Sequence, residues 1–302
     1  MREAPDIKYH ELSILIPTFN DECDQLVADL CHQLQPYPIT WEIIVADDAS
    51  TNMKIRETNH YIQQYPHCQY IERTNNVGRA GIRNFLAHQA HYEWLLFIDS
   101  DMRIPTDYMV KYLTCEEADV VDGGIKIIPS CQKGNLRCLH ELRTAKKHTL
   151  KYRLEHPYQD FHTANFLIRR QIMLTHPFDE RFVKYGYEDV LFGKSLQDLH
   201  IPILHIDNPT FFEIFEDNAS FVDKTEEGLR TLYQFREELK DYSHMIEKID
   251  RLRNYVPLAL IRLWHRLMGT WERQSLIKYP NLRIFDLYRL GYYLCLKDTI
   301  RE

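Results

Sequence analysis

The chain has 302 residues, of which 44% are hydrophobic and 27% charged, as is usual for a soluble globular protein with a substantial core. The net charge of −7 excludes a protein that binds nucleic acid through its overall charge. That charge is uneven, because residues 251–302 hold ten Lys/Arg against four Asp/Glu, a balance of +6 that leaves −13 for residues 1–250.

Cysteine spacing and hydropathy indicate which kinds of site and targeting segment are not expected in the chain. The seven cysteines are scattered without a C-x-x-C pair, so the sequence indicates neither a zinc knuckle nor a disulfide framework. No apolar stretch follows the polar first residues, and no run approaches the roughly 20 apolar residues of a membrane-spanning helix. We therefore expect a cytoplasmic protein with no signal peptide.

Short apolar runs alternate with amphipathic stretches through the first two hundred residues. We predict strands at 12–17, 41–46, 70–71 and 94–98, with helices at about 21–34, 53–65 and 78–90 between them. Further strands are predicted at 120–123, 125–128, 166–168 and 203–206, and a basic helix or loop at 129–157. This order predicts an α/β fold with a mostly parallel sheet, helices on both faces and a helical extension after about residue 221.

Polar residues follow three of these predicted strands. They form the clusters Pro17-Thr18-Phe19-Asn20, Asp47-Asp48-Ala49-Ser50 and Asp99-Ser100-Asp101. In a parallel sheet such ends share one edge, where open α/β sheets bind their ligands. Each cluster alone fits a turn or a helix cap, but three at one edge predict a site. An Asp-x-Asp pair there supplies the oxygen ligands that Mn²⁺ or Mg²⁺ prefers while the cation grips a diphosphate.

Four ordered motifs resemble the family 2 glycosyltransferases, which are inverting enzymes with the GT-A fold. The motifs are the segments 12–20, 44–50, 76–84 (Asn-Val-Gly-Arg-Ala-Gly-Ile-Arg-Asn) and 99–101, and the resemblance covers roughly residues 10–215. It implies a nucleotide-diphospho-sugar as donor, most naturally a UDP-sugar, and Mn²⁺ or Mg²⁺ as cofactor. It also implies a glycan or a lipid-linked glycan as acceptor, in polysaccharide synthesis.

The resemblance assigns roles to these motifs. Pro17, Phe19 and Asn20 would belong to the nucleotide pocket, with Pro17 and Phe19 flanking the base, and Asp47 or Asp48 would accept from the uracil imide or the ribose. Arg83 would face the phosphates, although a helix residue paired with a nearby acid is the alternative. Asp99 and Asp101 would bind ribose and metal, Asp101 being the better candidate for the metal.

An inverting transfer needs a base that deprotonates the acceptor hydroxyl. Gly186-Tyr187-Glu188-Asp189 resembles the family's Glu-Asp motif, which makes Asp189 the base and Glu188 an orienting residue. The alternative is that both acids favour the first turn of a helix. His205 is a candidate third metal ligand, although Phe211-Phe212-Glu213 is an alternative match to that family position.

The division into parts and the competing functions complete the predictions. Residues 1–220 would form the catalytic domain and 221–302 a helical extension that packs on it, forms a homodimer or lies on the inner face of a membrane. A non-catalytic subunit that binds nucleotide-sugar or glycan is one alternative function. A nucleotidyltransferase is another, but the first loop lacks the glycines that hold a triphosphate.

Overall fold

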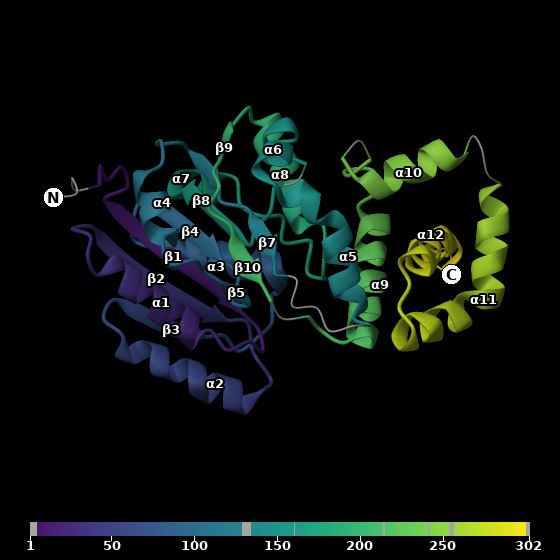
Figure 1. Ribbon diagram of the computed structural model, residues 1–302, viewed down its shortest axis with the longest axis horizontal. Helices are drawn as coiled ribbons and strands as arrows, with labels where there is room; N and C mark the ends of the chain where they lie inside the picture. Colours follow the sequence, from purple (N-terminus) through teal and green to yellow (C-terminus); the bar gives the residue numbers. More distant parts are fainter. Residues whose placement is uncertain are drawn as a thin grey trace.

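The computed structural model describes residues 5–128, 134–159, 161–213, 215–240, 242–253 and 257–299. A seven-stranded sheet in the order β3-β2-β1-β4-β8-β6-β9 fills one end of the molecule, and helices fill the other (Figure 1). The strands are β1 (Glu11–Thr18), β2 (Thr40–Asp47), β3 (Cys68–Glu72), β4 (Trp94–Ile98), β6 (Val120–Asp122), β8 (Asn165–Arg169) and β9 (Ile203–His205). β3, β2, β1 and β4 are parallel, whereas β8 runs antiparallel to both β4 and β6.

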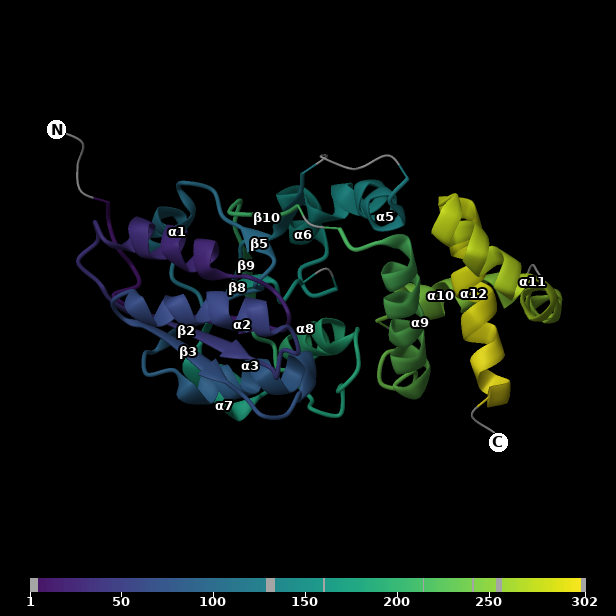
Figure 2. The ribbon, with the colours of Figure 1, turned by 90° about the horizontal axis from the view of Figure 1, so that it is seen from below.

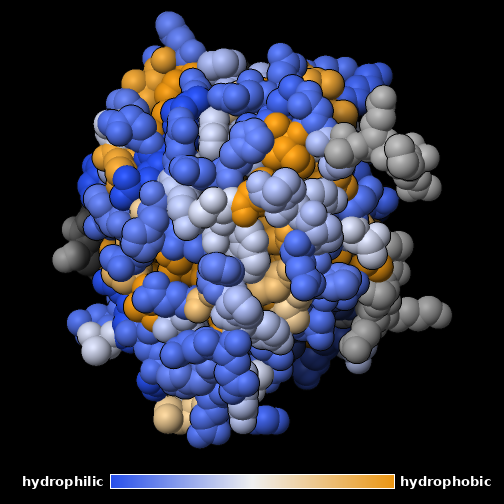
Figure 3. Space-filling view, turned by 90° about the vertical axis from the view of Figure 1, so that its left-hand side faces the viewer, coloured by the Kyte–Doolittle hydropathy of each residue, from blue (hydrophilic) through white to orange (hydrophobic). Residues whose placement is uncertain are grey.

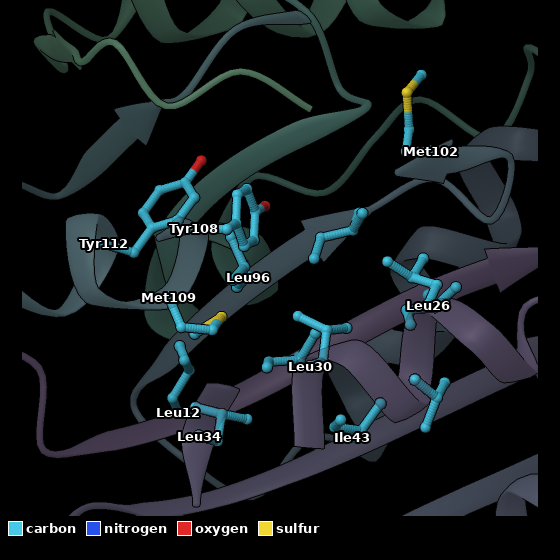
Figure 4. Close-up of a cluster of buried hydrophobic side chains, with 14 of the residues drawn as sticks. Leu12, Leu26, Leu30, Leu34, Ile43, Leu96, Met102, Tyr108, Met109 and Tyr112 are labelled. Atoms are coloured by element: carbon cyan, nitrogen blue, oxygen red, sulfur yellow. The ribbon is translucent and has the colours of Figure 1, made fainter. Parts of the chain in front are cut away.

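Helices lie on both faces of the sheet, as predicted. One face packs against α1 (Asp24–Leu34) and α4 (Tyr108–Thr114), and the other against α3 (Gly78–Gln89), α7 (Arg170–Thr175) and α8 (Glu188–Asp198). β1 shows why, because its side chains alternate: Leu12, Ile14 and Ile16 enter the first core while Leu15 enters the second. Figure 4 shows the leucines of α1 lying over β1 and β2 in the first core.

Some boundaries differ from those predicted. The helix expected at 53–65 is α2 (Met53–His60) followed by a 3₁₀ turn, η1 (Tyr61–Gln64). A second sheet has the order β5-β10-β7, formed by β5 (Met102–Arg103), β7 (Ile125–Ile127) and β10 (Thr210–Phe212). β5 and β10 were not predicted because two- and three-residue strands are too short to show an alternating pattern.

The basic stretch predicted at 129–157 is helical where it is described. It contains α5 (Leu136–Thr144), η2 (Ala145–His148) and α6 (Leu150–Glu155), while residues 129–133 lie outside the described residues. Cys138 in α5 is disulfide-bonded, a bond that the scattered cysteine spacing did not indicate.

The C-terminal part consists of α9 (Asn218–Gln234), α10 (His244–Arg253), α11 (Leu258–Lys278) and α12 (Leu282–Thr299). α9 lies between the sheet and the last two helices in both ribbon views (Figures 1 and 2). Leu136 of α5 shares a buried cluster with Phe221 of α9, Leu276 of α11 and Phe285 of α12. Arg143 of α5 also forms two hydrogen bonds to Asp286 of α12. Within the described residues, no helix is long and apolar enough to span a membrane.

Candidate active site at the carboxyl edge of the sheet

The three polar clusters meet at the carboxyl ends of adjacent parallel strands β2, β1 and β4. A cavity of about 460 Å³ is lined there by Pro17 and Phe19 after β1, Asp48 after β2, and Asp99 and Asp101 after β4. A second cavity, of about 220 Å³, shares Asp99 and Asp101 and is lined by Glu188 and Asp189 as well. The geometry therefore brings together residues up to 172 positions apart in the sequence.

Asp47 and Asn20, both predicted to bind the nucleotide-sugar, instead hold the loops. Asp47 is 1% exposed, and its two carboxylate oxygens accept hydrogen bonds from the Ser50 backbone N–H (2.6 Å) and the Tyr70 hydroxyl (2.7 Å). Asn20 has a left-handed backbone (φ 57°), and its side-chain oxygen accepts from the N–H groups of Thr51 and Asn52, both at 2.9 Å. Neither residue lines the cavity, so both have a structural role here and their contact with a donor stays a prediction; Asp48, the other candidate of the Asp47/Asp48 pair, does line it.

Asp48 lines the cavity and also fixes the start of α3. Its carboxylate accepts from the backbone N–H groups of Val77 and Gly78, both at 2.9 Å, as an anion does at a helix N-terminus. Burial raises the pKa of Asp48 above its ordinary value. Gly78 is required here, because its φ is +78° and a Cβ would lie 2.4 Å from the carbonyl oxygen of Val183.

Two arginines on α3 hold Asp99. Arg83 donates to Asp99 Oδ1 (2.5 Å) and Arg79 to Asp99 Oδ2 (3.2 Å), so both oxygens are engaged. The Arg83 side chain is only 1% exposed, whereas that of Arg79 is 44% exposed and lines both cavities. Arg83 thus forms the ion pair that was the alternative to phosphate contact, but it also lines the larger cavity, so its contact with phosphates stays a prediction; Arg79 is the more exposed of the two arginines.

Asp101 differs from Asp99 in that no arginine of the described residues is hydrogen-bonded to it. Burial and the nearby charge of Asp99 raise the pKa of Asp101 to about 6, although Arg79 acts in the opposite direction. A negative charge that is costly to bury and has no bonded counterion suits a divalent cation. Asp101 is thus the carboxylate in this site whose chemistry fits Mn²⁺ or Mg²⁺.

His205 does not join Asp101. Its Nδ1 lies 2.9 Å from Asp122 Oδ2 and its Nε2 lies 3.0 Å from the Pro157 carbonyl oxygen, in a buried cluster with Arg153. Both ring nitrogens are engaged, so the prediction of His205 as a metal ligand is wrong for this arrangement. Among the residues that the structure describes, no three His, Cys, Asp or Glu side chains are grouped to hold a metal. Mg²⁺ is commonly bound by one or two carboxylates and substrate phosphates, and Asp101 fits such a site.

Glu188 and Asp189 occupy the first turn of α8 with contrasting surroundings. Glu188 is 5% exposed and lies 3.8 Å from Arg79 and 4.0 Å from Arg83. Burial and the neighbouring charge of Asp189 raise the pKa of Glu188, and its Oε2 atom has no hydrogen-bond partner in the part of the chain that the structure describes. Asp189 is half-buried and lines the second cavity. Asp189 is therefore the better placed of the two to meet an incoming hydroxyl.

The loop before α8 has an unusual backbone. Gly186 (φ 96°) and Tyr187 (φ 70°) are both left-handed, and this conformation costs a residue with a side chain roughly 1–2 kcal/mol. α9 supports the loop, since the Thr231 hydroxyl donates to the Tyr185 carbonyl at 3.2 Å. A Cβ on Gly186 would lie 3.3 Å from the Cα of Gly228 in α9. Strain of this kind is common where a backbone positions functional groups.

The sequence assigned Arg79 no role of its own, and it did not predict that His148 pairs with His162 of the candidate segment 162–165. Arg79 lies one helical turn before Arg83, and the i, i+4 spacing could have indicated that both face Asp99. His148 and His162 also line the second cavity, with His148 Nδ1 3.0 Å from His162 Nε2. Burial lowers the pKa of His148 to about 3, so it is neutral at physiological pH. No spacing in the sequence indicated this pair.

Comparison with known proteins identifies the family. The profile of glycosyl transferase family 2 matches residues 13–175, more than half of the chain. The chain belongs to this family. The poly(ribitol-phosphate) beta-glucosyltransferase of Bacillus spizizenii is 32% identical over 122 residues, covering 38% of this chain and 19% of that protein. The chondroitin synthase of Pasteurella multocida is 26% identical over 220 residues, covering 61% of this chain and 23% of that protein.

The match therefore spans a minor part of these curated relatives, about a fifth of their length. The fold also resembles a mannosyltransferase from Pyrobaculum calidifontis solved with GDP-Man and Mn²⁺. The TM-score is 0.55 at 14% identity, over 98% of this chain and 88% of that one. The family 2 resemblance and the α/β fold predicted from the sequence are thus confirmed.

Proposed function

We propose that this family 2 protein is an inverting glycosyltransferase that moves a sugar from a nucleotide-diphospho-sugar, with UDP-sugars as the donor class, to a hydroxyl of a glycan or lipid-linked acceptor. The observation that carries the proposal is the shared cavity, which Asp101 lines on the β4 side and Asp189 on the α8 side. Asp101 is suited to bind a cation that contacts the leaving diphosphate, and Asp189 is suited to act as the base that deprotonates the acceptor.

The donor would occupy the larger cavity. Pro17 and Phe19 form its wall after β1, and Phe19 is 46% exposed, which suits contact with a nucleobase. Arg79 would lie beside the diphosphate, with its guanidinium already oriented by Asp99. Asp101 would hold Mn²⁺ or Mg²⁺, and the cation when bound supplies positive charge that stabilises the departing diphosphate.

Asp189 would deprotonate the acceptor hydroxyl, whose oxygen then attacks the anomeric carbon as the bond to the diphosphate breaks. Because attack and departure are on opposite sides of the sugar, the anomeric configuration inverts. Glu188, held near Arg79 and Arg83, would keep the first turn of α8 in place. The names of the two curated relatives, for poly(ribitol phosphate) glucosylation and chondroitin synthesis, support a glycan or polyol acceptor.

The test is release of nucleoside diphosphate from a panel of UDP-sugars with Mn²⁺, Mg²⁺ or a chelator. We expect release that requires the cation and is lost in Asp101→Ala. Donor binding without any release, with or without acceptor, would instead indicate a non-catalytic binding subunit. Full activity of Asp101→Ala would contradict the assigned role of that carboxylate.

A further inference from the structure

Helix α11 carries five large apolar residues on a face that points to solvent, whereas Leu276 near its end is buried. The exposed fractions are 61% for Leu260, 53% for Leu263, 43% for Trp264, 73% for Leu267 and 52% for Trp271. These positions recur at intervals of three and four, so they form one stripe along the helix. Figure 1 places α11 at the outer end of the molecule, beyond α12. We call these five residues the α11 stripe.

The buried side of α11 is fixed by Leu276 and by polar contacts, one of which is donated by Trp264 of the α11 stripe. Glu272 is 1% exposed, and its carboxylate accepts from Trp264 Nε1 (2.8 Å) and faces His265 Nδ1 (3.1 Å). Gly291 of α12 packs so tightly on His265 that a Cβ there would lie 2.6 Å from the His265 Cβ. These contacts fix the rotation of α11 about its own axis. They therefore determine that the α11 stripe faces solvent.

The surface at the opposite end of the molecule, around the sheet, has no comparable stripe among the residues that Figure 3 colours. Figure 3 shows that face as mostly hydrophilic, with apolar residues in small separate patches. In α1, by contrast, Leu26, Leu30 and Leu34 face the sheet and are fully buried. A continuous exposed stripe of leucine and tryptophan is uncommon on a protein that has no partner there.

Charge decides between two occupants of the stripe. α11 contains Arg262, Arg266, Arg273 and Lys278, and its single acid, Glu272, is buried. Two copies of the chain meeting through α11 would bring together segments that each carry the +6 of residues 251–302. An anionic lipid surface supplies the opposite charge, and tryptophan favours the level of the lipid headgroups.

We propose that the α11 stripe docks the protein on the surface of an anionic lipid bilayer. α11 lies in the plane of the interface, with the leucines and both tryptophans among the acyl chains near the headgroups. Arg266 and Lys278, both exposed, contact the lipid phosphates. The docking requires neither the donor nor the proposed reaction.

Vesicle binding of the whole 302-residue chain tests the proposal. We expect flotation with vesicles of phosphatidylcholine and phosphatidylglycerol, little with phosphatidylcholine alone, and weakening as salt is raised. Trp264 and Trp271 emission should shift to the blue on binding, because the other two tryptophans, Trp41 and Trp94, lie in or against the first core. The double variant Leu263→Glu/Leu267→Glu should reduce binding by about tenfold or more.

The matched control is Leu154→Glu/Leu199→Glu, which changes two leucines of 59% and 42% exposure outside α11 and should bind as the unmodified protein does. If the α11 variant does not fold by circular dichroism, Arg266→Glu/Lys278→Glu replaces it and should weaken binding to anionic vesicles alone. Unchanged binding in the α11 variants would overturn the proposal. So would a dimer in light scattering that Leu263→Glu/Leu267→Glu dissociates without any vesicle binding by the unmodified protein.

Discussion

The candidate site has an inner layer of paired charges and an outer layer that is open to ligands. Arg83, Asp99 and Glu188 form the inner layer, and all three are less than a tenth exposed. Arg79, Asp101 and Asp189 form the outer layer and are only partly buried, although residues of both layers line the cavities. Both layers contain one arginine and two acids, so residue type does not separate them. The difference lies in burial and partners, and it predicts that the inner layer supports the fold while the outer layer performs the chemistry.

Removing the proposed base should give the largest effect. Asp189→Asn keeps the size of the side chain but cannot accept the acceptor proton, so we expect the transfer rate to fall by about 10²–10⁴-fold. Donor affinity, measured by calorimetry with a UDP-sugar and Mn²⁺, should be unchanged. Asp198→Asn in the same helix, where the side chain is 64% exposed, is the control and should transfer normally. Loss of donor binding in Asp189→Asn would assign Asp189 a structural role.

Replacing each of the two arginines of α3 should have different effects: one replacement should lower the stability of the fold and the other the affinity for the donor. Arg83→Met leaves Asp99 and Glu188 buried with less counter-charge, so the free energy of unfolding should fall by about 3–5 kcal/mol. Arg79→Met removes a partly exposed ion pair and should change stability by less than about 1 kcal/mol while weakening donor binding. Denaturant unfolding and donor titration measure both quantities. Equal losses of unfolding free energy in the two variants would contradict the division into an inner layer that supports the fold and an outer layer that binds ligands.

Lowering the pH should weaken the binding of a divalent cation at Asp101 of the outer layer. The pKa of Asp101 is raised to about 6, by burial first and then by Asp99 and Asp21, while Arg79 and Arg137 oppose this. The carboxyl is therefore protonated below pH 6 and ionised above it. Because a cation binds the ionised form, affinity for Mn²⁺ should be nearly constant above pH 7 and fall by about tenfold per pH unit well below 6. Manganese titration over this pH range checks the prediction, and a constant affinity down to pH 5 would contradict it.

Replacing Asn20 should have the smallest effect of these changes, and it should alter the stability of the fold but not donor binding. Asn20→Ala removes the acceptor for two backbone N–H groups at a left-handed position, so unfolding should cost about 1–2 kcal/mol less. The affinity for UDP-sugar, measured below the unfolding transition, should not change. A marked loss of donor affinity at unchanged stability would support the sequence prediction that Asn20 contacts the donor.

The sequence predicted the framework of the site because strongly apolar strands and the polar residues after them are local signals. The strand expected at 94–98 is β4 with the same bounds, and the clusters after β1, β2 and β4 do converge. Which charges are open could not be predicted, because Asp99 is paired by residues 16 and 20 positions away. His205 was misassigned for the same reason, since its partner Asp122 lies 83 positions away on a neighbouring strand.

The contact between α9 and the loop before α8 means that the helical part is not a removable appendage. A chain shortened before α9 would keep Asp101, Arg79 and Asp189, yet Tyr185 would lose the hydroxyl of Thr231 and the Gly186 backbone would lose the α9 wall beside it. The left-handed Tyr187 would then be free to relax, and Asp189 would move with it. The geometry of the proposed site thus depends on residues of α9 outside the two cavities, and we expect the shortest fragment that keeps this geometry to extend through α9.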